Sequence, residues 1–215
     1  MTQKLIIIHG LNNKLEALNP LGESFKDDYQ VTYLRLPQHG QKPLNLDFND
    51  AVELFEKELK SHLDESSFIL SYSLGCAYLQ YLWENKQLNF PMKRVIYLSP
   101  ALKSKMRIGR FAFLPGLLPV PSFSPWDLRL RPFCYWGQYK TLMKLNEKLR
   151  LESYPLIYAD PDDELISLEG LNYVPIKRDY LPYGQHHLTI HPRYFKNGEW
   201  EKFVSDLKVR FREGT

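Results

Sequence analysis

The 215-residue sequence has little of what marks several classes of protein. It holds two cysteines, Cys76 and Cys134, which are too few for a disulfide framework. Neither a C-x-x-C nor an H-E-x-x-H pattern occurs, so we expect no metal site and no cofactor. The formal net charge is only +3, which gives no reason to expect a nucleic-acid partner.

Long apolar runs are also missing. No stretch reaches the roughly 20 residues that span a bilayer, and the first apolar run, Leu5–Ile8, is too short for the core of a secretion signal. We therefore expect a cytoplasmic protein without stable membrane insertion, and its oligomeric state stays open. With 44% apolar and 25% charged residues, the composition is that of a globular protein, and the length fits a single domain over residues 1–215.

Short apolar runs alternate with helical patterns along the chain. Helices are expected near 48–63, 74–86 and 194–212, with shorter candidates near 20–27 and 165–170, and strands near 4–8, 30–36, 67–71, 93–98, 155–159 and 173–178. Asn49 or Asp50 is the expected N-cap of the helix at 48–63. The alternation predicts an α/β fold, with a mostly parallel central sheet of about six strands and helices on both faces.

The pentapeptide Ser71-Tyr72-Ser73-Leu74-Gly75 lies between an apolar strand and a helical pattern. A serine on such a sharp strand-to-helix turn exposes its hydroxyl at the end of a sheet, which is the geometry of a nucleophile elbow. The usual G-x-S-x-G pattern has a glycine where this chain has Ser71. Small residues are needed there because backbone segments approach closely. The pattern is common by chance, so its neighbours in the sequence must support it.

Two further turns follow the first two expected strands, His9-Gly10-Leu11 and Leu36-Pro37-Gln38-His39-Gly40. Together with the serine turn they resemble the α/β-hydrolase superfamily, which has an H-G oxyanion loop, an L-P-G-H-G turn and the elbow in this order and spacing. Gln38 replaces a glycine of that family turn. The resemblance covers most of the chain except about residues 101–150. Because the expected oxyanion strand begins near residue 4, we expect the sheet to lack the family's antiparallel N-terminal hairpin, as in a minimal member.

The resemblance implies a serine hydrolase of the carboxylesterase or lipase type, with Ser73 as nucleophile. The backbone N–H groups of Leu11 and Leu74 would form the oxyanion hole. A serine also needs a base, and the base needs an orienting acid. In this fold, acid and histidine follow the serine in that order.

Four carboxylates follow the expected strand at 155–159. We choose Asp163 as the acid, since the family pattern D-x-x-V/I fits Asp163 to Ile166, and Asp162 is the alternative. Among the histidines after the acid, we choose His186 as the base. The neighbouring His187 stays open as the alternative, and His191 is expected to be structural.

Residues 101–150 are expected to form a cap inserted between two strands. This segment is rich in aromatic residues and proline, and proline interrupts helices, so no long helix is expected in it. Two interpretations stay open. The segment either packs on the body as a loop-rich cap, or it forms a mobile lid whose aromatic side chains line an acyl or aryl pocket above Ser73.

The sequence thus predicts a hydrolase that cleaves an ester, thioester or amide of an apolar small-molecule substrate through an acyl-enzyme on Ser73. An acyltransferase would use the same catalytic triad. A non-catalytic binding protein on the same fold also stays open, because a fold does not determine a function.

Overall fold

A six-stranded sheet forms the centre of the molecule, in the order β2-β1-β3-β4-β5-β6. The computed structural model describes residues 3–11, 18–39, 46–102, 132–161, 168–176, 192 and 195–214, with the side chains of 132–136 excepted. Every neighbouring pair of strands is parallel, so the strands end at one shared edge. The strands are β1 (Gln3–Ile8), β2 (Tyr29–Leu34), β3 (Ser67–Tyr72), β4 (Val95–Leu98), β5 (Leu156–Ala159) and β6 (Val174–Pro175).

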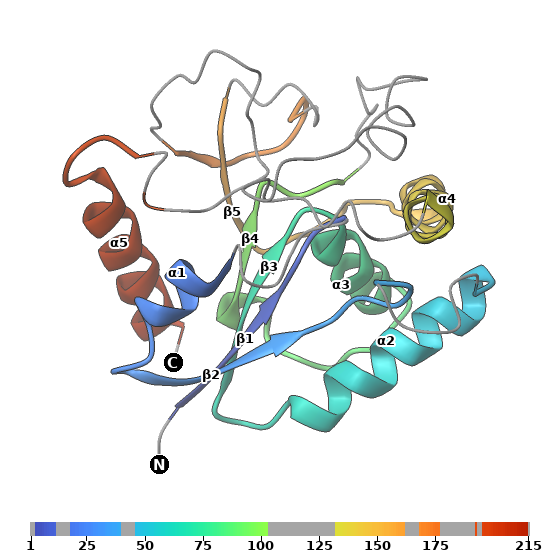
Figure 1. Cartoon of the computed structure of the whole chain (residues 1–215), viewed down its shortest axis with the longest axis horizontal. Coiled ribbons are helices and arrows are strands. Elements are labelled where there is room, and N and C mark those ends of the chain that lie inside the picture. Colours follow the sequence, from blue (N-terminus) through green and yellow to red (C-terminus); the bar gives the residue numbers. More distant parts are fainter. Residues whose placement is uncertain are drawn as a thin grey trace.

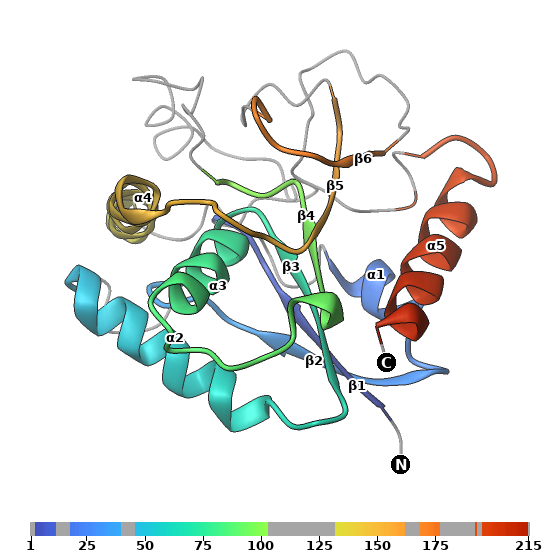
Figure 2. The same cartoon turned by 180° about the vertical axis from the view of Figure 1, so that it is seen from behind.

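Helices cover both faces of this sheet (Figures 1 and 2). On one face lie α1 (Asn19–Glu23) and α5 (Glu199–Glu213), and on the other lie α2 (Phe48–His62), α3 (Leu74–Glu84) and α4 (Pro132–Lys148). A short 3-10 helix, η2 (Met92–Arg94), precedes β4. The predicted α/β architecture with a parallel six-stranded sheet is therefore confirmed.

Each face of the sheet has its own hydrophobic core. Along β1, Ile6 and Ile8 belong to the core beneath α2 and α3, whereas Leu5 and Ile7 belong to the core beneath α1 and α5. Alternate side chains of a strand point to opposite faces, so a strand buried on both sides is apolar throughout. This burial explains the unbroken apolar run at the start of the sequence.

Helices α2 and α5, each of 15 residues, use the same spacing to cover their cores. Their buried apolar residues recur at i, i+3, i+4, i+7 and i+11, which places them on one helical stripe. These residues are Phe48, Ala51, Val52, Phe55 and Leu59 in α2, and Trp200, Phe203, Val204, Leu207 and Phe211 in α5.

Two expectations about helices are wrong. The N-cap of α2 is Asp47, whose carboxylate accepts the backbone N–H of Asp50 at 2.9 Å, rather than Asn49 or Asp50. The segment 101–150 does contain a long helix, since α4 runs from residue 132 to residue 148. Its proline stands at the first position, where the missing N–H has no intrahelical acceptor and the ring is tolerated.

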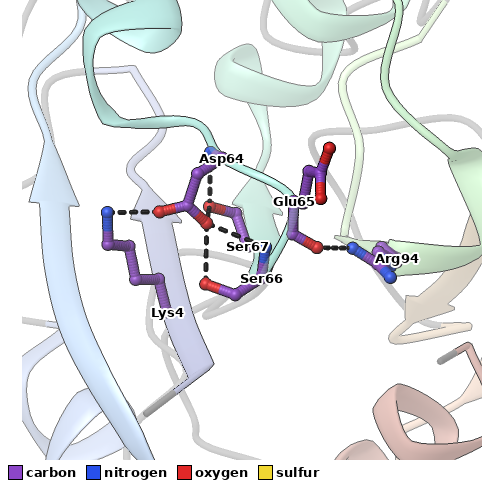
Figure 3. A network of polar contacts seen from close by, with 6 residues as sticks. All are labelled: Lys4, Asp64, Glu65, Ser66, Ser67 and Arg94. Carbon is purple, nitrogen blue, oxygen red and sulfur yellow. Dashed lines mark hydrogen bonds and ion pairs between the residues drawn. The ribbon is translucent and has the colours of Figure 1, made fainter. Parts of the chain in front are cut away.

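A polar turn closes the amino-terminal edge of the sheet (Figure 3). The carboxylate of Asp64 accepts the backbone N–H and the hydroxyl of Ser66 at 2.8 and 2.7 Å, and it pairs with Lys4 of β1. The guanidinium of Arg94 donates to the carbonyl of Glu65. These contacts join the starts of β1, β3 and β4. Within the described ranges, no helix is both long and apolar enough to cross a membrane.

Candidate active site

The order of the strands creates a topological switch point at the carboxyl edge of the sheet. The chain leaves β1 toward β2 on one side, whereas it leaves β3 toward β4 on the other. In open parallel sheets, ligand sites lie at such a switch point, outside the carboxyl ends of the two diverging strands. Because Ile8 pairs with Ser71, the segments that follow, His9 to Leu11 and Tyr72 to Leu74, begin side by side at this switch point.

Ser73 stands at the turn between β3 and α3 with a strained backbone. Its φ of 50° and ψ of −113° are values that residues other than glycine rarely adopt, and such strain costs of order 1–3 kcal/mol. Its N–H donates to the carbonyl of Leu98, and its carbonyl accepts from the N–H groups of Cys76 and Ala101, each at 3.1 Å. These three bonds hold the turn in the shape of a nucleophile elbow.

The residues flanking the elbow must be small, as the sequence indicated. A Cβ added at Gly75 would lie 2.7 Å from the side chain of Ile8, 2.8 Å from Ser71 Oγ and 2.9 Å from the carbonyl oxygen of His9. Ser71 itself is fully buried. The first turn of α3 is thus pressed against the end of β1, which brings the elbow next to the His9-Gly10-Leu11 segment.

The two residues expected to supply the oxyanion hole follow the neighbouring strands β1 and β3. Leu74 is the first residue of α3, and N–H groups in the first turn of a helix have no intrahelical acceptor. The helix dipole adds partial positive charge there. Leu11 follows β1 and is 8% exposed. Leu74 directly follows Ser73 in the chain, and Leu11 and Leu74 belong to the same hydrophobic core.

His9 is fully buried and uses both nitrogens of its ring. Nε2 accepts the backbone N–H of Leu36 at 2.9 Å, so the ring proton is on Nδ1, which lies 2.6 Å from the carbonyl oxygen of Gly10. Burial is the largest cause that lowers the pKa of His9 well below its ordinary value, and the nearby His39, whose ring centroid is 4.1 Å away, adds to it. His9 is therefore neutral and has no free nitrogen to accept a proton from Ser73.

The turn after β2 contains Gln38, the residue at which this sequence differs from the L-P-G-H-G turn that it resembles. Gln38, which replaces the family glycine, has a φ of 64°, and this left-handed conformation costs an ordinary residue roughly 1–2 kcal/mol. Its side-chain amide donates to the carbonyl of Leu46 at 2.9 Å, which offsets part of that strain. The buried Gln138 of α4 donates to the carbonyl of Pro37 at 3.2 Å. The sequence reasoning missed Gln138, because a lone glutamine in a helix carries no motif.

Ser99 is a second residue near the elbow that the sequence reasoning missed. It follows β4 directly, is fully buried and has a φ of 41°. Its N–H donates to the carbonyl of Tyr158 at 2.8 Å, while the preceding Leu98 holds the N–H of Ser73. The sequence carries no signal for this position, because a residue before proline ordinarily has extended backbone with a negative φ.

The remaining candidate residues lie outside the described residues. These are Asp162, Asp163, His186, His187 and His191, together with residues 103–131 of the expected cap. In the part of the chain that is described, no three His, Cys, Asp or Glu side chains gather into a group that would hold a metal ion.

Comparison with solved structures identifies the fold. An α/β hydrolase fold protein from Burkholderia ambifaria is 13% identical, with a TM-score of 0.65, and the match covers 96% of this chain and 90% of that one. The RedJ thioesterase of prodiginine biosynthesis in Streptomyces coelicolor is 12% identical, with a TM-score of 0.63 over 97% and 90% of the two chains. A monoacylglycerol lipase from Paleococcus ferrophilus is 15% identical, with a TM-score of 0.61 over 98% and 94%.

The chain therefore has the α/β-hydrolase fold, as the sequence resemblance predicted. No family model matches the sequence, and no curated protein matches it either.

Proposed function

We propose that the protein is a serine hydrolase that cleaves an ester, thioester or amide of an apolar small molecule. The observation that carries this proposal is the backbone of Ser73, which is held at φ 50° by three hydrogen bonds at the switch point of the sheet. Backbone strain of this kind persists only where surrounding contacts enforce it, and it clusters at functional sites.

In the proposed reaction, Ser73 Oγ attacks the carbonyl carbon of the substrate and passes its proton to His186. Asp163 holds the histidine in the required tautomer. The histidine then returns the proton to the leaving alcohol, thiol or amine, which leaves an acyl group on Ser73. A water molecule, deprotonated by the same histidine, releases the acid and restores the serine.

The negative charge of each tetrahedral intermediate would be stabilised by the N–H groups of Leu11 and Leu74. The placement of Leu74 at the start of α3 supports this role, because the helix dipole favours an anion there. One such donor typically contributes a factor of about 10²–10³ to kcat.

The solved structures with the same fold support hydrolysis as the reaction class. They include a thioesterase and a monoacylglycerol lipase, and a thioesterase domain of NocB that carries a fluorophosphonate analogue as a covalent complex. A covalent phosphonate reports an activated nucleophile in that protein. We infer the same kind of chemistry here from the matching fold and the elbow at Ser73.

Ester hydrolysis by the purified chain tests the proposal. We expect turnover of p-nitrophenyl esters, with the octanoyl ester preferred to the acetyl ester if residues 101–150 form an apolar lid. Ser73→Ala should abolish turnover and keep the wild-type melting temperature. Absence of turnover on esters and thioesters of both chain lengths would favour a binding protein instead.

Paired substitutions test the base and the acid. His186→Ala should lower kcat by about 10³-fold or more, and His187→Ala should lower it less. Asp163→Asn should reduce turnover while substrate binding is kept, and Asp162→Asn should matter less. The opposite ranking in either pair would move that role to the neighbouring residue and leave the nucleophile unchanged.

A further inference from the structure

The two hydrogen bonds of the His9 ring involve two segments at the candidate site, the one that follows β1 and the turn that follows β2. The ring belongs to the residue directly after β1, its Nε2 atom accepts from Leu36 in the turn after β2, and its Nδ1 atom faces the carbonyl oxygen of Gly10. Each nitrogen therefore has a separate structural task. The Nε2 contact ties two strand ends together, and the Nδ1 contact fixes the orientation of one peptide group.

That peptide group is the one that joins Gly10 to Leu11. In a trans peptide, the carbonyl C=O and the following N–H point in opposite directions. Since the Gly10 oxygen lies 2.6 Å from Nδ1, the N–H of Leu11 must point away from the His9 ring. Glycine at position 10 would otherwise let this peptide rotate freely, because glycine adopts many backbone conformations.

We infer that His9 is a positioning residue that sets the oxyanion donor through its Nδ1–H group. In this inference, donation from Nδ1 to the Gly10 carbonyl keeps the Leu11 N–H turned away from the ring, toward the oxyanion that would form at Ser73. This inference rests on the proposed function, in which Leu11 supplies one oxyanion donor. His9 would act only through that peptide group, because both of its ring nitrogens are already engaged.

The surroundings of the ring favour the neutral form that this role needs. A protonated ring would donate from both nitrogens, and it would then lose the N–H of Leu36 as a partner. Burial disfavours a positive charge on the ring. The charge is disfavoured further by His39, which packs against the ring, and by Arg35, which directly follows β2. The contacts thus select one tautomer, with the proton on Nδ1 and the lone pair on Nε2.

Two conservative variants separate the tasks of the two nitrogens. The amide of His9→Asn places a donor near the Nδ1 position and nothing near Nε2. The longer amide of His9→Gln places an acceptor near the Nε2 position and nothing near Nδ1. His9→Asn should therefore keep kcat near the wild-type value and melt at a lower temperature, since the Leu36 N–H loses its acceptor.

His9→Gln should show the reverse pattern. Its melting temperature should stay closer to the wild type, while kcat per titrated active site falls, with KM little changed, by at least about 10-fold and at most the 10²–10³-fold of a lost oxyanion donor. A merely structural role for His9 would instead rank kcat and melting temperature in the same order. Equal kcat values in the two variants, or an unchanged kcat in His9→Gln, would overturn the inference.

Nuclear magnetic resonance tests the inference without turnover. The ¹⁵N shifts of the His9 ring in the wild type should show a protonated Nδ1 and an unprotonated Nε2, and a proton on Nε2 would overturn the inference whether or not the variants fold. The Leu11 amide signal should move in His9→Gln and stay in place in His9→Asn. If the wild type hydrolyses no ester, the proposed function fails, and these two signals still decide how the peptide is positioned.

Discussion

Replacing Gly75 with alanine should displace the elbow that holds Ser73. Gly75 lies in the first turn of α3, and an added methyl group would meet three atoms at less than 3.0 Å. One of these is the backbone oxygen of His9, and another is the methyl group Cγ2 of the fully buried Ile8. Neither can move aside without shifting β1.

Two effects of opposite sign decide the stability of this variant. Alanine is favoured over glycine in a helix by about 1 kcal/mol. Overpacking a buried site costs about 1–3 kcal/mol, and contacts with fixed backbone and core atoms place Gly75→Ala near the upper value. The net result should be a loss of about 2 kcal/mol, or roughly 4–8 °C in melting temperature for a chain of this length.

Urea unfolding of Gly75→Ala measures this loss, and Gly22→Ala in α1 is the matched control. A Cβ at Gly22 would overlap the hydroxyl end of the Tyr33 ring, at 1.9 Å from Oη and 2.8 Å from Cζ, and would lie 3.2 Å from Val31 Cγ1. The Tyr33 side chain is half-buried and able to turn aside, unlike the backbone oxygen at Gly75. Gly22→Ala should therefore be nearly neutral. A Gly75→Ala variant more stable than the wild type would show that helix propensity outweighs the close approach, and it would refute this reasoning.

Two further predictions concern polar contacts that hold the strands in place. The Glu84 carboxylate accepts the backbone N–H groups of Arg150 and Leu151, just before β5, at 2.7 and 2.9 Å. Glu84→Gln should therefore lower the free energy of unfolding by about 1–3 kcal/mol. Glu53→Gln, at an exposed position of α2, should leave it unchanged. Hydrogen bonds from Lys4 and Ser66 hold the pKa of Asp64 well below its usual range. The carboxylate therefore makes its full contribution to the free energy of unfolding above the unfolded pKa of about 3.9. The stability that Asp64→Asn loses should shrink as the pH falls below that value. A loss that does not depend on pH would contradict this.

The strands that carry the site could be predicted from the sequence because they are buried on both faces. β1 and β3 lie in the middle of the sheet, so each reads as an unbroken apolar run that ends at a short turn. The same pattern placed Ser73 and the His9-Gly10 pair at strand ends, and Gly75 at the start of the helix that follows Ser73. These features are local, and a local pattern is sufficient to find them.

Features that depend on distant contacts could not be predicted in this way. Helix α4 was not predicted, because the prolines before it argue against a helix in this segment. Its buried Leu142 and Leu145, with Leu149 just beyond its end, nevertheless follow helical spacing. The hydrogen bond from Ser99 to Tyr158 and the one from Arg150 to Glu84 each join residues that are far apart in the sequence. The acid and the base also stay predictions, since Asp163 and His186 lie outside the described residues.

Mapping the site of phosphonylation tests the central claim most directly. The intact protein is treated with a fluorophosphonate, digested, and analysed by fragmentation mass spectrometry, which resolves Ser73 from the nearby Ser71. The account predicts one adduct per chain, on Ser73, and none in a folded Ser73→Ala variant. An adduct on any other serine, or stoichiometric labelling of Ser73→Ala, would contradict the claim that Ser73 is the nucleophile.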